Sequence, residues 1–152
     1  MRVFVYYNLH KKTFSVKALD GSRKGRVVYH ADEVLLSDCQ FKVSEPGRQR
    51  VLSERRKNVH AGVVGTLEAT TGEQTAAGRD CHCSDTGWAQ SDKWTGRDAD
   101  IADAVTSRGS QVSYNPYRSG KFYRKHDETT IEDAGIAYCS KEPQGKPTIF
   151  AH

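Results

Sequence analysis

Short runs of alternating apolar and polar residues recur along this chain and constrain its fold more than any other feature. Val3, Val5 and Tyr7 lie in a stretch rich in β-branched and aromatic residues with a period of two, which is typical of a strand. Residues 13–19 alternate again after a polar turn, so these two runs are expected to form a hairpin. The same reasoning predicts strands at 26–30, 34–36, 39–43, 59–67, 110–114, 122–123, 135–140 and 147–151. The first five strands are expected to form an antiparallel meander.

One basic segment departs from the strand pattern. Ser44 can cap a helix because its hydroxyl can accept a hydrogen bond from a free backbone N–H, and Pro46 is tolerated in a first helical turn. Residues 48–57 (RQRVLSERRK) are therefore predicted to form one short helix. Val51 and Leu52 are its only apolar residues, so the helix is expected to pack through a narrow stripe and to present its arginines outward.

Residues 70–109 are rich in Gly, Ser, Thr and Asp and contain few regular patterns. So long a loop inside a compact domain is functional, mobile or an element that the pattern conceals. Residues 98–107 are predicted to form a short helix, since Ile101, Ala104 and Val105 recur at helical spacing. The prediction for residues 1–152 is a single α+β domain with a basic β-rich half at 1–67, a long mixed insertion at 70–109 and C-terminal strands at 110–152.

The net charge of +4 is unevenly distributed. Residues 1–66 hold 13 Lys and Arg against 6 Asp and Glu, a net +7, whereas residues 67–152 hold 10 against 13, a net −3. This asymmetry fits either a surface for an anionic partner or an ordinary solvated face. The first twelve residues resemble neither a signal peptide nor a membrane span, and the tight Cys81-x-Cys83 spacing favours reduced thiols. A cytoplasmic protein that does not bind membranes is expected.

Two blocks of the sequence are distinctive. The first contains Asn8-Leu9-His10-Lys11, Phe14-Ser15-Val16, Lys24-Gly25-Arg26-Val27 and above all residues 55–61 (RRKNVHA), and the second contains Tyr114-Asn115-Pro116-Tyr117 and the aromatic Phe122. These segments resemble small accessory proteins of tailed bacteriophages, of the kind that take over host functions. The resemblance covers about residues 1–66 and 110–125, and residues 70–109 look like an insertion unique to this chain. The resemblance implies an infected bacterial cell as the setting and proteins that act on the host, but it transfers no catalytic residue.

The basic helix and the strand after it form the first candidate ligand-binding site, which consists of Arg48, Arg55, Arg56, Lys57 and His60. Arginines on one exposed face can hold phosphate oxygens bidentately. Strand glycines such as Gly62 and Gly65 mark a bulge, a bend or the close approach of another backbone or a ligand. The alternative is a solvated helix face that Glu54 partly neutralises.

Aromatic and basic residues near position 120 form a second candidate binding group. Tyr117, Arg118 and Tyr123 are expected to be exposed and to contribute ligand contacts. Exposed aromatic rings stack on bases in single-strand binders and nucleotide pockets. The more frequent role of strand aromatics is to fill the core.

The most metal-like stretch is Cys81, His82 and Cys83, because thiolates and imidazole are the ligands that zinc prefers. Its one-residue gap is shorter than the gap in structural zinc sites, and no second pair follows, so a loop with free thiols is expected instead. No cofactor is predicted. The sequence contains no phosphate-binding glycine loop, HExxH helix or nucleophile elbow, which favours a protein that is not an enzyme.

Three functions remain open on these grounds. The first is a non-enzymatic phage accessory protein that binds an anionic partner, either a nucleotide signal or nucleic acid, to counter host defence or redirect host machinery. The second is a small phosphodiesterase or nuclease that uses His60 and His126. The third is a protein–protein inhibitor of a host enzyme that acts through residues 72–107.

Overall fold

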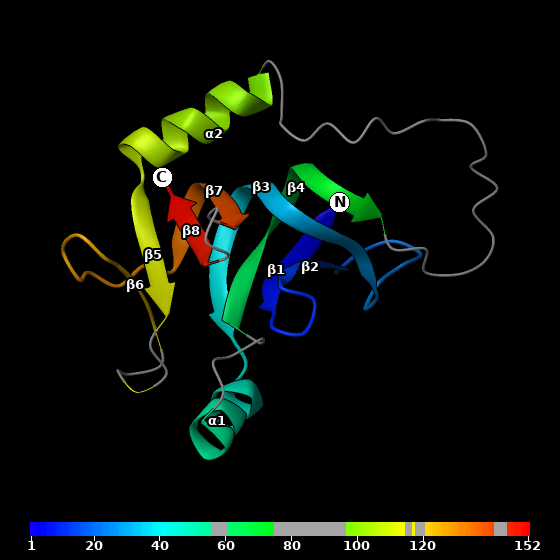
Figure 1. Cartoon of the computed structure of the whole chain (residues 1–152), viewed down its shortest axis with the longest axis vertical. Helices are drawn as coiled ribbons and strands as arrows, with labels where there is room; N and C mark the ends of the chain where they lie inside the picture. Colours follow the sequence, from blue (N-terminus) through cyan, green and yellow to red (C-terminus); the bar gives the residue numbers. More distant parts are fainter. Residues whose placement is uncertain (56–60, 75–96, 115–116, 118–120, 142–145) are drawn as a thin grey trace.

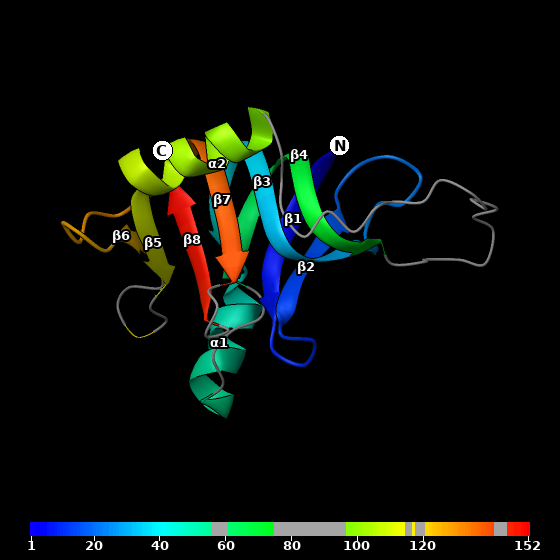
Figure 2. The ribbon, with the colours of Figure 1, turned by 45° about the horizontal axis from the view of Figure 1, so that its top comes forward.

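The protein is built on one antiparallel sheet that curls strongly (Figures 1 and 2). The computed structural model describes residues 1–55, 61–74, 97–114, 117, 121–141 and 146–152. In these residues the strands are β1 (Arg2–Asn8), β2 (Thr13–Ala18), β3 (Val27–Val43), β4 (Ala61–Gln74), β5 (Ser110–Tyr114), β6 (Phe122–Arg124), β7 (Asp133–Lys141) and β8 (Pro147–Ala151), and the helices are α1 (Glu45–Glu54) and α2 (Arg97–Arg108). The described part of the chain is thus mostly antiparallel sheet with two short helices, within the predicted α+β class.

The first four strands form a closed ring. The sheet order is β2-β1-β4-β3-β7-β8-β5-β6, and β2 also pairs with the beginning of β3. The hairpin of β1 and β2 is confirmed, and sequential strands go on pairing antiparallel, β2 with β3 and β3 with β4, before β4 returns to pair with β1. The expected meander of five short strands differs from the structure in its number of strands, because the runs at 26–30, 34–36 and 39–43 belong to the single strand β3. Apolar side chains from all four strands fill this ring, among them Val3, Val5, Phe14, Val16, Val34 and Val63.

The remaining strands close a second ring that shares β3 with the first. β7 pairs with the second half of β3, and β8, β5 and β6 follow in order. Residues 131 and 132 complete the ring, because the Ile131 N–H donates to the Phe122 carbonyl (3.0 Å) and the Phe41 N–H donates to the Glu132 carbonyl (2.8 Å). The rings of Phe41 and Phe122 lie 5.3 Å apart across this closure.

The two helices occupy different ends of the sheet (Figure 1). α2 covers one face over β5, β7 and β8, where Ala102 and Val105 pack against Leu35 and Tyr138. The predicted helix at 98–107 is therefore confirmed. The expected insertion at 70–109 contains regular structure at both of its described ends, because β4 runs to Gln74 at one end and α2 lies at the other. α1 extends from the opposite end, directly after β3. No described helix is long and apolar enough to cross a membrane.

Candidate functional site

α1 begins and ends at residues with clear capping signals. The Ser44 hydroxyl accepts a hydrogen bond from the Gly47 N–H (3.2 Å), as predicted for an N-cap, and Pro46 lies in the first turn. Arg55 ends the helix in the left-handed region (φ 52°). The helix predicted over 48–57 therefore occupies Glu45–Glu54, because the cap at Ser44 starts the first turn immediately after itself.

Two of the predicted ligand-binding residues lie towards opposite ends of α1. Arg48 lies in the first turn and Arg55 at the C-terminal end, about 10 Å apart along the helix axis. Arg48 is held by Glu45, whose carboxylate lies 3.2 Å from its guanidinium, and 27% of the Arg48 side chain is exposed. Arg55 is exposed. Arg56, Lys57 and His60 lie outside the described residues.

Arg48 lies close enough to Tyr114, at the end of β5, for its charge to act on the phenol. Burial raises the pKa of Tyr114, the positive charge of Arg48 lowers it, and the negative charge of Glu45 raises it. All three residues are therefore electrostatic neighbours, and we call them the Arg48–Tyr114 site. Arg48 Nε and Tyr114 Oη are both buried and have no hydrogen-bond partner among the described residues. The site thus holds two buried donors for which the described part of the chain supplies no acceptor.

An open pocket of about 540 Å³ lies at the closure of the second ring, at the end of β3. Phe122 joins it to the Arg48–Tyr114 site, because its ring lies 5.1 Å from that of Tyr114. The pocket is lined by Gln40, Phe41, Lys42, Val43, Lys121, Phe122, Ile131, Glu132 and Asp133. Lys121 forms an ion pair with Glu132 (3.7 Å). Lys42 is exposed and forms no ion pair with any described residue. It lies on the polar face of the predicted strand 39–43 but was not among the predicted binding residues.

The predicted aromatic residues have different environments. Tyr117 is 70% exposed, as expected. Tyr123 is half-buried in β6, where it pairs with Ser113 and forms a bridge with Thr130. Because neighbouring residues of a strand point to opposite faces, Tyr123 lies on the face opposite the buried Phe122. Arg118 lies outside the described residues.

The residues proposed for catalysis or metal binding do not form a described cluster. His126 is exposed and lies 3.2 Å from Asp127, whereas His60, Cys81, His82 and Cys83 fall outside the described residues. Among the described residues, no group of three or more His, Cys, Asp or Glu could hold a metal ion. Cys39 and Cys139 are buried free thiols, and burial raises the pKa of Cys39 to about 12.

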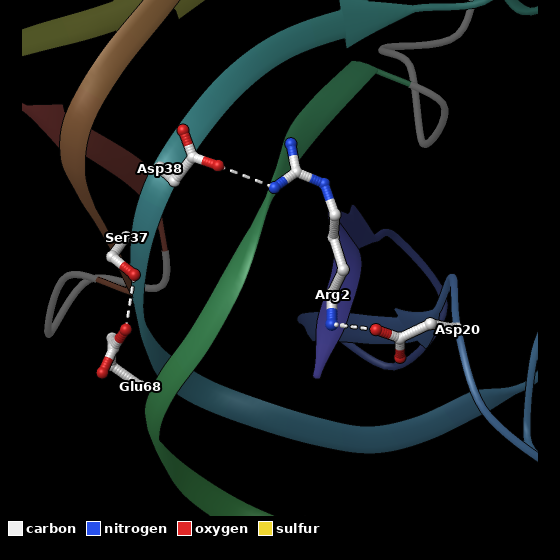
Figure 3. Close-up of polar contacts among 5 residues, drawn as sticks. All are labelled: Arg2, Asp20, Ser37, Asp38 and Glu68. Atoms are coloured by element: carbon white, nitrogen blue, oxygen red, sulfur yellow. Dashed lines mark hydrogen bonds and ion pairs between the residues drawn. The ribbon is translucent and has the colours of Figure 1, made fainter.

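The end of the sheet away from α1 has a different character (Figure 3). The Arg2 backbone N–H donates to Asp20 (2.9 Å), and its guanidinium forms an ion pair with Asp38 (2.9 Å). Ser37 donates a hydrogen bond to Glu68 close by. Because three carboxylates lie at this end and two of them are bonded to Arg2, this end would repel an anion rather than bind it.

Comparisons with known proteins give a consistent setting. The model of the family described as Mycobacterium phage L5 gene 82 protein matches residues 1–82. The Gene 82 protein of Mycobacterium phage L5 is 32% identical over 146 residues, which cover 92% of this chain and 90% of that protein. No solved structure matches the chain. Because the family match continues to residue 82, residues 70–82 are not peculiar to this chain, and an insertion unique to it cannot begin at residue 70 as predicted.

Proposed function

Since this chain belongs to the family of the Mycobacterium phage L5 gene 82 protein, we propose that it is a non-enzymatic phage accessory protein whose Arg48–Tyr114 site binds an anionic nucleotide. In the infected cell, such binding would counter a host defence signal or redirect host machinery. The proposal extends the expectation that the basic helix holds phosphate, and it locates the contact at the first turn of α1.

One observation carries the proposal, namely the two buried donors Arg48 Nε and Tyr114 Oη, for which the described residues supply no acceptor. A buried polar group without a partner costs on the order of 1–3 kcal/mol, so such groups call for a bound water, ion or ligand. A phosphate oxygen can accept from a guanidinium N–H and from a phenol O–H, and charge makes these hydrogen bonds strong. A phosphate at this site would therefore relieve a cost that the free protein bears.

The surroundings favour a nucleotide over inorganic phosphate. Tyr117 offers an exposed ring three residues after Tyr114, and Phe41 and Phe122 line the neighbouring pocket. Lys42 adds a cation that no described carboxylate pairs with. Nucleotide sites commonly combine apolar and aromatic walls with a few placed polar groups. The carboxylate of Glu45, which already engages Arg48, would limit the site to one phosphate group near that residue.

Isothermal titration calorimetry of the full chain tests this function. The ligands are inorganic phosphate, nucleoside monophosphates and diphosphates, and cyclic mononucleotides and dinucleotides. We expect one of the nucleotides to bind at least about tenfold more tightly than inorganic phosphate. Tyr114→Phe removes only the hydroxyl and should weaken binding about tenfold, while Arg48→Gln should weaken it further because it removes the charge. Arg97→Gln on α2 removes an exposed charge elsewhere and should leave binding unchanged.

Three results would contradict the proposal. Equal affinity of the wild type, Tyr114→Phe and Arg48→Gln for the nucleotide would rule out this site. A ligand recovered as cleaved product by chromatography would show catalysis, as in the alternative that uses His60 and His126. If the protein bound a polynucleotide but none of the nucleotides tested, the ligand would be nucleic acid instead of a nucleotide.

A further inference from the structure

Most of the positive charge of the N-terminal half lies in its first 31 residues. They contain seven Lys and Arg and a single acidic residue, Asp20, a net +6 of the +7 found in residues 1–66. This segment comprises β1, β2, the turns on either side of β2 and the beginning of β3. In Figures 1 and 2 β1 and β2 lie together on the side of the sheet away from β5, β6 and α2. Two of these basic residues, Arg2 and Lys17, lie in β1 and β2, and the other five lie in the turns on either side of β2.

The register of these strands identifies the side chains on their outer face. Val3, Val5, Phe14 and Val16 fill the first ring, so their neighbours along each strand point outward. In β1 and β2 these are Phe4, Tyr6, Ser15 and Lys17, with Phe4 opposite Lys17 and Tyr6 opposite Ser15. Ser15 in turn lies opposite His30 at the start of β3. We call this set, Phe4, Tyr6, Ser15, Lys17 and His30, the β1–β2 outer face.

Two aromatic rings form a platform on this face. Phe4 and Tyr6 are stacked, with ring centroids 5.6 Å apart and an angle of 28° between their planes. Both are only partly buried and belong to neither hydrophobic cluster of the described residues. Phe4 lies over Gly62, where an added Cβ would come within 3.0 Å of its ring. The platform is thus fixed by close packing and remains in contact with solvent.

A chain of hydrogen bonds orients His30 beside this platform. The backbone N–H groups of His10 and Lys11 donate to Asn8 Oδ1 (3.0 and 3.2 Å). The amide nitrogen of Asn8 must therefore face Ser15, and it donates to Ser15 Oγ at 3.3 Å. The hydroxyl of Ser15, which is fully buried, forms a hydrogen bond of 3.1 Å with His30 Nδ1.

These hydrogen bonds hold the His30 ring in place. Its Nδ1 is engaged by Ser15, so Nε2 is the ring nitrogen left for another partner. Partial burial, and then the charge of Lys11, lower the pKa of His30. In the strand register His30 lies opposite Ser15, which itself lies opposite Tyr6. Lys17 adds a cation on the same face.

From these features we propose that the β1–β2 outer face binds single-stranded nucleic acid. Unpaired bases would stack on Phe4 and Tyr6, and the backbone would run past Lys17 and His30. Basic turns stand at both ends of β2, with Lys11 and Lys12 at one and Lys24 and Arg26 at the other. A strand of six residues spans about 20 Å, which suits roughly four nucleotides. A duplex keeps its bases paired and offers none for stacking.

This surface is independent of the Arg48–Tyr114 site, so the two can be tested separately. The experiment measures the fluorescence anisotropy of a labelled oligothymidylate of twelve residues with the full chain over a series of KCl concentrations. Lys17→Glu should weaken binding at least about tenfold and reduce the dependence of log K on log[KCl] by about one phosphate contact. The matched control Lys125→Glu changes an exposed charge outside this face and should retain most of the affinity.

The aromatic contribution has its own pair of variants. Tyr6→Phe keeps the ring and should bind like the wild type, whereas Tyr6→Leu keeps an apolar side chain but loses stacking, and should bind about tenfold more weakly. Circular dichroism confirms that both are folded. Any one of three results would overturn the proposal. Tyr6→Phe and Tyr6→Leu could bind equally well, or Lys17→Glu and Lys125→Glu could lose the same affinity. The third is a duplex that binds as tightly as the single strand. Arg48→Gln should leave oligonucleotide binding unchanged.

Discussion

Two glycines of β4 permit neighbouring backbones to come unusually close. A Cβ at Gly62 would lie 2.1 Å from the Val5 carbonyl oxygen, and one at Gly65 would lie 2.9 Å from the Ser37 carbonyl oxygen. These contacts belong to β1 and β3, which flank β4 on either side. The glycines are therefore needed for the tight curvature of the first ring, and backbone packing accounts for them without a ligand.

Gly62→Ala should lower the free energy of unfolding by about 3 kcal/mol, because the new methyl group would displace the backbone of β1 in a packed ring. Urea unfolding followed by circular dichroism measures the change. Gly135→Ala is the matched control, since its Cβ would meet only the His152 carbonyl oxygen at 3.6 Å, an ordinary contact. A loss in Gly62→Ala no greater than that in Gly135→Ala would show that β1 can move away freely.

The sequence predicted the importance of these glycines but not its cause. A glycine within a strand pattern indicates a bulge, a bend or a close approach. Which group approaches Gly62 depends on the pairing of β1 with β4, and no local pattern specifies that pairing. The same limit applies to the candidate site. Arg48 and Tyr114 were each recognisable as basic and aromatic, whereas their proximity depends on where β5 ends relative to α1.

Among the elements, β3 departs most from its predicted form. The pattern indicated three strands at 26–30, 34–36 and 39–43, and the structure has one strand, Val27–Val43. The polar pairs Asp32-Glu33 and Ser37-Asp38 resemble turns, but they lie at register shifts where extra residues are absorbed without ending the strand. Asp38 accordingly has a positive φ of 48°. Isolated strands such as β5 and β8, whose ends coincide with turn residues, were predicted with their exact bounds.

α2 attaches to the sheet through few side chains, so its docking is easily weakened. Val105 is 2% exposed and packs with Leu35 and Tyr138. Val105→Ala should lower the free energy of unfolding by about 2 kcal/mol through lost burial and the cavity that remains. Thermal and urea unfolding measure this change, with Ala104→Ser on the exposed side of α2 as the control. If both variants are as stable as the wild type, α2 contributes little to the stability of the sheet.

At the scale of the whole molecule, the fold is two rings of strands that share β3. The first ring closes by regular strand pairing, whereas the second closes through the short contact of residues 131 and 132 with β3 and β6. This closure adjoins the pocket and the Arg48–Tyr114 site. The proposed nucleotide site therefore lies beside the shortest strand contact of the second ring, while the β1–β2 outer face belongs to the first ring. Opening the closure should disturb the Arg48–Tyr114 site and leave the β1–β2 outer face intact.

Phe122→Ala tests this division, because the buried Phe122 ring contacts both Phe41 and Tyr114. Its loss should lower the free energy of unfolding by about 4 kcal/mol. Hydrogen exchange should accelerate at the amides of Phe41 and Ile131 at least about tenfold more than at the amides of β1, since the closure can open locally while the first ring stays paired.

Phe150→Ala serves as the comparison, because that ring packs beside Tyr138 on the α2 side rather than at the closure. It should leave the exchange of the Phe41 amide close to that of β1. Nucleotide binding should fall in Phe122→Ala and persist in Phe150→Ala, while oligonucleotide binding should persist in both. Uniform acceleration of every amide in Phe122→Ala would mean that the two rings unfold as one cooperative unit, and the separation of the two surfaces would then lose its structural basis.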